Sequence, residues 1–437
     1  MPGVPKSKGC NTCRKQKKLC DEAQPKCGRC VRLKTECVGI GVRRFLFKQD
    51  ALTRYAAPAR STTSPRPAPS SETTRIAGAL VHILEIRDIR HDIRSIGGKY
   101  FLDLPRRVGH LAAAYDASVA ALVASYSALY GRGGGRTASL MRYGDALAAT
   151  RVALPEGGIP TVVKMYMVFN IYVCQEWTCD TDPVRSSKHR EMLAFLLREV
   201  VARGELPQID TNYIYALCQM VVYESFVNEK VELGPWFWEA YGVVRHTGPY
   251  PYHYGKTFLS IRLETYAEAS LYFRSPRRNL PQLTQIHNLI QAERPALWAE
   301  VEAWTATCRD PSAPDAAHRA LLSYQTAYGL LLSIGARVIR AIRRVNPDID
   351  LLLQSYNLCD DAIRLARQSE AGHRPFGAWF VPKFLRLVRA GVPGYRRGEV
   401  DALMRDFAQD FKGIDYIKES EWVEGRYNAM EDMVSGQ

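Results

Sequence analysis

The sequence has no hydrophobic run long enough to cross a membrane and no apolar segment close to its N-terminus. Its most apolar stretch, Met165 to Cys174, follows Lys164 and is interrupted by Asn170, so we expect no membrane-spanning helix. The opening residues MPGVPKSKGC lack the hydrophobic core of a secretory signal. We therefore expect the eleven cysteines to stay reduced, as metal ligands or core residues rather than a disulfide framework.

The sequence also lacks the alternating pattern of strands bounded by hairpin turns. From Ile76 onward, apolar residues recur at helical spacing, and Gly and Pro separate the helical segments. The clearest predicted helices cover residues 111–130, 161–177, 187–203, 211–228, 257–273, 283–304, 314–344, 351–370 and 397–411. We therefore predict an all-α body.

No combination of residues typical of an enzyme active site stands out. The segment GRGGGR at 131–136 lacks the Lys-Ser/Thr pair and the preceding strand of a phosphate-binding loop, which favours a flexible connection between helices. His91-Asp92 has no further metal-binding partner at suggestive spacing, which favours an exposed helix face. The later cysteines are predicted to be small core residues: Cys174, Cys179, Cys218, Cys308 and Cys359. We predict that the chain is not an enzyme.

Positive charge is concentrated in the first fifty residues. Residues 1–50 contain thirteen Lys or Arg and four Asp or Glu, whereas the remaining 387 residues contain 46 and 41. Most of the formal net charge of +14 therefore belongs to one small unit. A basic head on a nearly neutral body is typical of a protein that binds a polyanion through the head.

Composition separates this head from the helical body. Residues 56–74 hold four prolines and many Ser and Thr, with almost no bulky apolar residue. They bury too little surface to offset the entropy cost of ordering. We predict three segments: a head at 1–50 that ends in a basic arm, a flexible linker at 51–75, and an all-α domain at 76–437 with an acidic C-terminal tail.

Six cysteines of the head follow a repeated spacing. They are Cys10, Cys13, Cys20, Cys27, Cys30 and Cys37. The frame C-x2-C-x6-C occurs at residues 10–20 and again seventeen residues later. Each frame offers three thiolates, whereas a closed structural zinc site needs four. Two shared thiolates would complete two tetrahedral sites, and zinc would supply the folding free energy that so small a unit cannot obtain from an apolar core.

This segment resembles the fungal Zn(2)-Cys(6) binuclear zinc cluster. The whole chain is similar, more weakly, to transcription factors in which a fungal-specific helical regulatory domain follows that cluster. The resemblance implies a module of two short helices around two Zn²⁺ ions, in which Cys10 and Cys27 bridge the ions. The other ligands implied are Cys13 and Cys20 for one ion, and Cys30 and Cys37 for the other.

The stretch after the second cysteine is the more basic of two equivalent stretches. Residues 14–19 read RKQKKL, whereas residues 31–36 read VRLKTE, so we expect the first helix to enter the major groove of DNA. In the family, a lysine four places after the second cysteine reads a CGG-type triplet, and here that residue is Lys17. Lys18 is a second candidate for base contact. The expected phosphate contacts are Arg14, Lys15 and Arg32.

Two positions depart from the family pattern, because Gln16 and Leu19 stand where basic residues are usual. The base contacts of this stretch therefore stay open. The alternative is a solvated charge run on a structural zinc site, or one that binds protein or RNA.

Two features of the body concern its partners. Isoleucines between residues 83 and 96 follow a 3-4-3 spacing that fits either a short dimer helix or core packing, so a homodimer stays open. Residues 399–437 hold ten acids against four Lys or Arg, together with aromatic residues. This composition fits either an activation segment that docks on a coregulator or a closing amphipathic helix.

These observations favour a sequence-specific transcription factor of RNA polymerase II genes that acts in the nucleus. Its expected partners are double-stranded DNA and the transcription machinery or coregulators. The family and the chain length are compatible with a pathway-specific regulator, such as one that governs a biosynthetic gene cluster. The alternative is a scaffold or corepressor that uses the zinc cluster for protein contacts.

Overall fold

The computed structural model of the chain describes residues 9–37, 71–94, 98–130, 135–178, 182–245, 257–369, 373–411 and 414–435. The chain divides into two compact units, Met1–Ala68 and Pro69–Gln437. The basic arm and most of the predicted linker at 51–75 lie outside the described residues. The last residues of that linker instead open the first helix of the larger unit, where Ser71 accepts a hydrogen bond from the Thr74 N–H at 3.1 Å as N-cap.

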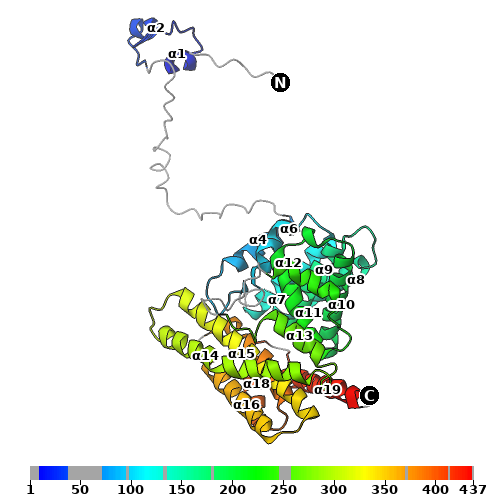
Figure 1. Cartoon of the computed structure of the whole chain (residues 1–437). Helices are drawn as coiled ribbons and strands as arrows, with labels where there is room; N and C mark the ends of the chain where they lie inside the picture. The colour runs from blue at the N-terminus through cyan, green and yellow to red at the C-terminus, as the bar shows by residue number, and fades with distance from the viewer. Residues whose placement is uncertain are drawn as a thin grey trace. The chain divides into compact units, whose positions relative to one another are not determined.

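Two short helices, α1 (Asn11–Lys15) and α2 (Gly28–Arg32), form the regular structure of the small unit (Figure 1). Its core consists of cysteine alone. The buried residues are Cys10, Cys13, Cys27 and Cys30, each at most 2% exposed, with Cys20 and Cys37 packed against them. No apolar side chain of the described head supports this core, so the unit needs another source of folding free energy.

The larger unit is built from helices, and the described residues contain no strand. Its first part comprises α4 (Glu72–Glu85), α6 (Leu104–Arg107), α7 (Ala113–Leu129), α8 (Gly135–Ala153), α9 (Thr161–Thr178), α10 (Pro183–Ala202), α11 (Thr211–Val227), α12 (Pro235–Val244) and α13 (Leu263–Tyr272). Its second part comprises α14 (Leu280–Cys308), α15 (Asp315–Val345), α16 (Ile349–Ser369), α17 (Phe380–Gly391), α18 (Arg397–Ala408) and α19 (Tyr416–Ser435). Every described helix is too short or too polar to cross a membrane.

The two parts of the larger unit share one continuous hydrophobic core. In the first part, α7 packs against α8 and α9, and α11 packs against α10, α12 and α13. In the second part, α15 is central and packs against α14, α16 and α17, while α19 packs against α17. In Figure 1 the first part runs from blue to green and the second from yellow-green to red.

Two glycines allow α15 and α17 to pack closely. A Cβ on Gly329 would lie 2.6 Å from Cδ1 of Phe384, and a Cβ on Gly391 would lie 2.8 Å from Cβ of Ala336. Both distances are shorter than side-chain carbon atoms tolerate. The tight α15–α17 pair therefore depends on glycine at these two positions.

The predicted all-α body is confirmed, but the sequence analysis missed α12 and α17. Both helices carry a proline in the first turn, Pro235 at the start of α12 and Pro382 in α17. A proline in the first turn removes only an N–H that has no partner within the helix. Pro235, which the sequence pattern indicated as a break between helices, therefore begins one.

The prediction of an exposed face at His91-Asp92 was wrong. Asp92 is 2% exposed and pairs with Arg94 at 2.6 Å and Arg319 at 2.9 Å. The His91 ring lies 4.1 Å from that of Tyr130. Burial of this carboxylate is possible because two guanidinium groups neutralise it.

Other sequence-based interpretations are resolved by burial and helix bounds. Helix α4 ends at Glu85 and Ile93 is fully buried, so the isoleucine series does not continue as one helix. Three of the later cysteines are buried, Cys308 is partly buried, and Cys179 lies outside the described residues; the buried ones are Cys174, Cys218 and Cys359. Most of the GRGGGR segment also lies outside the described residues.

The acidic C-terminal segment is folded onto the body over its described length. Its buried aromatic residues, each at most 1% exposed, are Phe407, Phe411, Tyr416 and Tyr427. Acidic side chains of this segment pair with arginines of α15 and α17, for example Glu431 with Arg337 and Glu419 with Arg386. The segment therefore forms a closing helical layer.

Candidate metal centre and nucleic-acid interface

The six cysteines of the head converge in two overlapping groups. The sulfur atoms of Cys10, Cys13, Cys20 and Cys27 lie within 4.8 Å of one another, and so do those of Cys10, Cys27, Cys30 and Cys37. Cys10 and Cys27 belong to both groups, with their sulfur atoms 3.7 Å apart. Each group is a set of four thiols of the kind that binds one zinc ion tetrahedrally.

Backbone N–H groups support the outer ligands of each group. The Cys10 N–H donates to Sγ of Cys20 at 3.4 Å, and the Cys27 N–H donates to Sγ of Cys37 at 3.3 Å. The Cys10 N–H lowers the pKa of the Cys20 thiol. Bonds of this kind orient thiolate ligands and stabilise their negative charge.

The close packing of the sulfur atoms is suited to the binding of metal cations. The Cys13 N–H lowers the pKa of the Cys10 thiol, but burial and the neighbouring thiols raise it to about 12 overall. Several thiolates packed this closely repel one another, so they ionise together only when cations neutralise them. Soft sulfur donors in sets of four select ions such as Zn²⁺.

The backbone of the head repeats with a period of seventeen residues. Cys10 and Cys27 are the N-caps of α1 and α2 with ψ angles of 157° and 143°. Gln16 and Leu33 end the helices with φ of −85° and −88°. The repeated spacing of the cysteines is thus a repeated conformation, and the two halves are structurally equivalent.

Lys17 follows Gln16, the C-cap of α1, and does not belong to the helix. Its φ is +52°, and the equivalent Lys34 has φ of +47°. The Lys17 N–H donates to the Arg14 carbonyl at 3.1 Å, and the Lys18 N–H donates to the Cys13 carbonyl at 3.0 Å. This hydrogen-bond pair is a Schellman motif, which closes a helix with one left-handed residue. Lys17 and Lys18 therefore project from the turn that ends α1.

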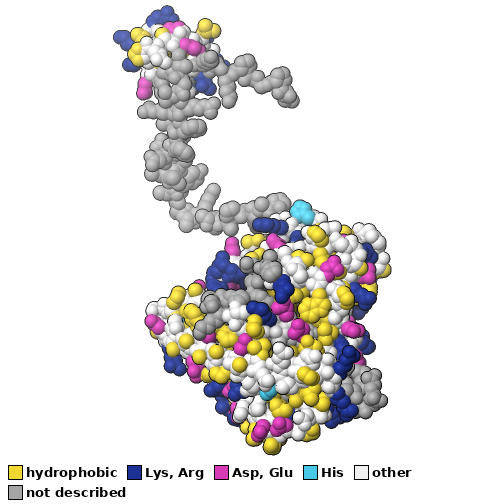
Figure 2. Space-filling model, viewed as in Figure 1, with side chains coloured by type: hydrophobic (Ala, Val, Ile, Leu, Met, Phe, Trp, Pro, Cys, Tyr) yellow, Lys and Arg dark blue, Asp and Glu magenta, His cyan; other side chains and the backbone are white. Residues whose placement is uncertain are grey.

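The predicted DNA-contacting residues lie on the surface of the head. Arg14, Lys15, Lys17, Lys18 and Arg32 are all exposed. The described residues 9–37 contain eight Lys or Arg against three Asp or Glu. Figure 2 shows Lys and Arg side chains at several points on the surface of this unit. The structure thus brings a basic surface onto the outside of the cysteine core.

The two departures from the family pattern are also on the surface. Gln16 is exposed, and Leu19 is 95% exposed. An apolar side chain so exposed contributes nothing to the core and is available for contact with a partner, such as a thymine methyl group. The sequence pattern alone marks Leu19 only as a position where a basic residue is usual.

An acidic residue stabilises the second half of the head. The Asp21 carboxylate accepts hydrogen bonds from the Gly28 N–H at 3.0 and 2.8 Å, at the start of α2. A Cβ on Gly28 would lie 2.5 Å from Oδ2 of Asp21, so this contact requires glycine. The role of Asp21 could not be predicted, because its partner lies across the loop that contains Pro25.

Residues 8–44 match the family model of the fungal Zn(2)-Cys(6) binuclear cluster domain. No curated protein and no solved structure matched the chain. Domains of this family bind two zinc ions, and they occur in DNA-binding transcription factors, which are typically nuclear, rather than in enzymes. With its converging cysteines, the segment 8–44 is therefore a domain of the fungal Zn(2)-Cys(6) binuclear cluster family, and a large helical unit follows it in the chain.

Proposed function

We propose that this protein is a sequence-specific transcription factor of RNA polymerase II genes that reads a CGG-like triplet in the major groove. It acts in the nucleus as a pathway-specific regulator, such as one that governs a biosynthetic gene cluster. The observation that carries the proposal is the group of exposed basic side chains held on a cysteine frame, at the turn that ends α1.

In this proposal Cys10 and Cys27 bridge the two zinc ions, and the other cysteines complete the two sites. The ligands of one ion are Cys10, Cys13, Cys20 and Cys27, and those of the other are Cys10, Cys27, Cys30 and Cys37. The overlap of the two sulfur groups supports this assignment. The ions fix the end of α1, and thereby the position from which the basic side chains leave the backbone.

Lys17 and Lys18 are proposed to contact base edges, because guanine presents two acceptors, O6 and N7, to a lysine in the major groove. Arg14, Lys15 and Arg32 are proposed to contact phosphates, which positions the head without reading sequence. The exposure of all five side chains leaves each of them accessible for contact with DNA.

A selection experiment tests the proposal. Zinc-loaded residues 1–55 are mixed with random double-stranded DNA, and the retained sequences are read after several rounds. We expect enrichment of a CGG-like triplet. Retention of DNA without any enriched motif, or no retention, would contradict sequence-specific binding and favour the alternative of a scaffold or corepressor that uses the cluster for protein contacts.

A further inference from the structure

A cavity of about 820 Å³ lies inside the larger unit. This volume is within the range of small-molecule binding sites. One face of each of six helices contributes most of the lining: α9, α10, α11, α15, α17 and α19. Since α9, α10 and α11 belong to the first part of the unit and the others to the second, the cavity lies between the two parts.

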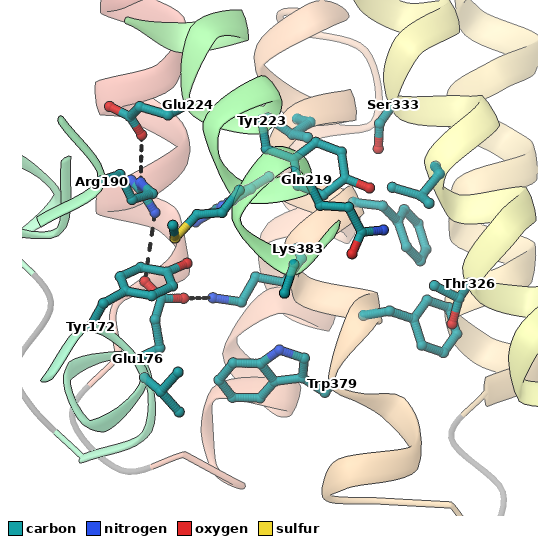
Figure 3. A pocket seen from close by; sticks show the side chains of 18 of the residues that line it. Tyr172, Glu176, Arg190, Gln219, Tyr223, Glu224, Thr326, Ser333, Trp379 and Lys383 are labelled. Atoms are coloured by element: carbon teal, nitrogen blue, oxygen red, sulfur yellow. Dashed lines mark hydrogen bonds and ion pairs between the residues drawn. The ribbon is translucent and has the colours of Figure 1, made fainter. Parts of the chain in front are cut away.

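The wall of the cavity is mainly apolar and aromatic, and Trp379 and Tyr223 are typical of it (Figure 3). Tyr223 lies in the C-terminal part of α11 between two buried residues, Val222 and Glu224, yet it is 37% exposed. Because Tyr223 lines the cavity, its accessible surface is available to an occupant. Aromatic walls of this kind favour flat, ring-containing molecules.

The charges in the wall neutralise one another. Each of three buried carboxylates has a cationic partner: Glu176 pairs with Lys383, Glu224 with Arg190, and Glu419 with Arg386. The side chains of these glutamates are at most 6% exposed. Figure 3 shows the Glu176–Lys383 and Arg190–Glu224 pairs along one side of the cavity.

At the rim, Asp92 pairs with two arginines, Arg94 and Arg319, and Arg319 also pairs with Asp315 at 3.7 Å. Among the described residues, every charged side chain of the wall therefore has a partner of opposite charge. An ionised ligand would lose its hydration shell on entering the cavity. Because the wall offers no uncompensated charge to replace that hydration, the binding of an ionised ligand would cost free energy.

Neutral polar groups lie on the other side of the cavity, on α11 and α15. Gln219 and Tyr223 are one helical turn apart on α11, and Thr326 faces the cavity from α15 (Figure 3). None of the hydrogen bonds found within the described part of the chain involves the hydroxyl group of Tyr223 or Thr326, and Gln219 donates one to the Tyr215 hydroxyl, at 3.4 Å. These groups are suited to hydroxyl or carbonyl groups of a ligand.

From these contacts we infer that the body binds an uncharged, ring-containing small molecule with a few hydroxyl or carbonyl groups. Its rings lie against the aromatic wall, and its polar groups meet Gln219, Tyr223 and Thr326. The occupant contacts both parts of the larger unit, including Trp422 and Tyr427 of the C-terminal helix α19. The inference concerns the body alone and holds whatever sequence the head selects.

The test uses the full zinc-loaded chain and prodan, an uncharged naphthalene ketone dye whose emission shifts to the blue in an apolar site. We expect a saturable blue shift with one dye per chain. Acetonaphthone, a neutral ketone, and naphthoate, its anionic counterpart, then compete for the site. We expect the ketone to displace prodan at a concentration at least about tenfold lower, because the carboxylate must be desolvated without a free cation.

Two variants localise the site. Thr326→Trp fills the cavity and should weaken prodan binding at least about tenfold. Gln285→Trp, on an exposed face of α14, is the matched control and should bind prodan as the unmodified chain does. Circular dichroism and the melting temperature report whether each variant folds.

Tyr223→Phe serves as a milder second variant, since it removes only a hydroxyl group. This variant should bind acetonaphthone several-fold more weakly than the unmodified chain does. The inference is overturned if prodan shows no saturable shift, if naphthoate competes as well as acetonaphthone, or if folded Thr326→Trp or, should that variant not fold, Tyr223→Phe binds like the unmodified chain.

Discussion

Lys17 occupies a backbone position that usually favours glycine. With φ of +52°, a side chain at this position costs about 1 kcal/mol relative to glycine. The equivalent Lys34 has the same conformation, with φ of +47°, in a stretch that is less basic. The two lysines therefore provide a matched pair that separates the role of the side chain from that of the backbone.

We expect Lys17→Ala and Lys17→Gly to lose the same discrimination for a CGG-like triplet, about 1–3 kcal/mol, because both remove the base contact. Lys17→Gly should in addition stabilise the head slightly, since it relieves the left-handed conformation. Binding to matched and mismatched DNA, measured by fluorescence anisotropy, gives the discrimination.

Lys34→Ala is the control and should keep the selected motif. Arg14→Ala should instead weaken all sequences about equally and reduce the salt dependence of binding. An unchanged motif in Lys17→Ala would show that another residue reads the triplet.

The bridging cysteines should differ from the others in their effect on metal content. Cys10→Ala or Cys27→Ala removes a sulfur atom from both groups, so we expect weaker binding of both zinc ions. Cys13→Ala or Cys37→Ala removes a sulfur atom from one group only, so the binding of one zinc ion should weaken before that of the other. Native mass spectrometry of the head counts the ions. Loss of a single ion from Cys10→Ala would contradict the bridging assignment.

His189 should make the body sensitive to mild acid. Burial lowers its pKa to about 4, and repulsion from Arg190 and Arg151 adds to this. An unfolded histidine has a pKa of about 6.5, so between pH 6.5 and 4 the unfolded chain takes up a proton that the folded chain does not. The free energy of unfolding should therefore fall as the pH drops through this window, by up to about 3 kcal/mol from this residue.

Urea unfolding at several pH values measures this effect. The free energy of unfolding of His189→Gln should fall less steeply between pH 6.5 and 4 than that of the unmodified chain. His82→Gln, at an exposed position of α4, should leave the slope as it is. Equal slopes in all three proteins would mean that His189 takes up its proton without unfolding.

At the scale of elements, a buried ion pair joins helix α19 to helix α15. Nη1 of Arg337 lies 2.6 Å from Oε1 of Glu431, and the Arg337 side chain is 1% exposed. Its guanidinium group also lies 4.0 Å from the ring centroid of Tyr427. Burial lowers the pKa of Arg337, which reflects the cost of holding this charge away from water.

Glu431→Gln leaves the Arg337 charge without its full counterion. We expect it to destabilise the body by about 3–5 kcal/mol, as for other broken buried pairs. Glu424→Gln, on the same helix, breaks a pair with Arg397 at 3.6 Å that is partly exposed, and it should cost less than about 1 kcal/mol. Thermal unfolding compares the two, and hydrogen exchange should show faster exchange in α19 only for Glu431→Gln. Equal stability of the two variants would contradict this prediction.

Long helices with strong apolar periodicity were predictable, and the shorter helices α12 and α17 were not. Helix α15, for example, covers almost the segment expected at 314–344. Helix α12 follows Gly234 and starts at Pro235, a dipeptide that marks both turns and helix starts. Only the packing of Phe237 and Tyr241 into the core decides between the two.

The metal centre was predictable because all its ligands lie within 28 residues of sequence, at a spacing tied to the chemistry of zinc. The cavity of the body was not. Its polar residues Gln219 and Thr326 come from helices more than a hundred residues apart, and each looks like an ordinary surface residue within its own helix. The buried Asp92 was misread for the same reason, since its partner Arg319 lies 227 residues away.

At the scale of the whole molecule, one head touches few base pairs, too few for useful specificity in a genome. A second source of specificity is therefore needed. We expect the full chain to bind paired triplets more tightly than one triplet through self-association of the helical body, because linked heads raise one another's effective concentration. The head alone should bind weakly to DNA with one triplet and to DNA with two triplets. Its affinity per triplet should be about equal in the two DNAs.

The measurement compares residues 1–55 and the full chain on DNA with one triplet and with two triplets at varied spacing. A preference of the full chain for one spacing would identify the geometry of the assembly. Equal affinities in all four combinations would show that the body adds nothing to DNA binding, so that the basic arm or another protein must supply the missing specificity.

The seventeen-residue repeat of the head has a consequence for engineering. Both hexapeptides, 14–19 and 31–36, leave the same kind of helix and pass through the same left-handed turn before they reach the next cysteine. The sequence RKQKKL could therefore replace VRLKTE without moving any metal ligand. The product would be a head with two reading loops on one cluster, a compact module for recognising two neighbouring triplets without a dimer.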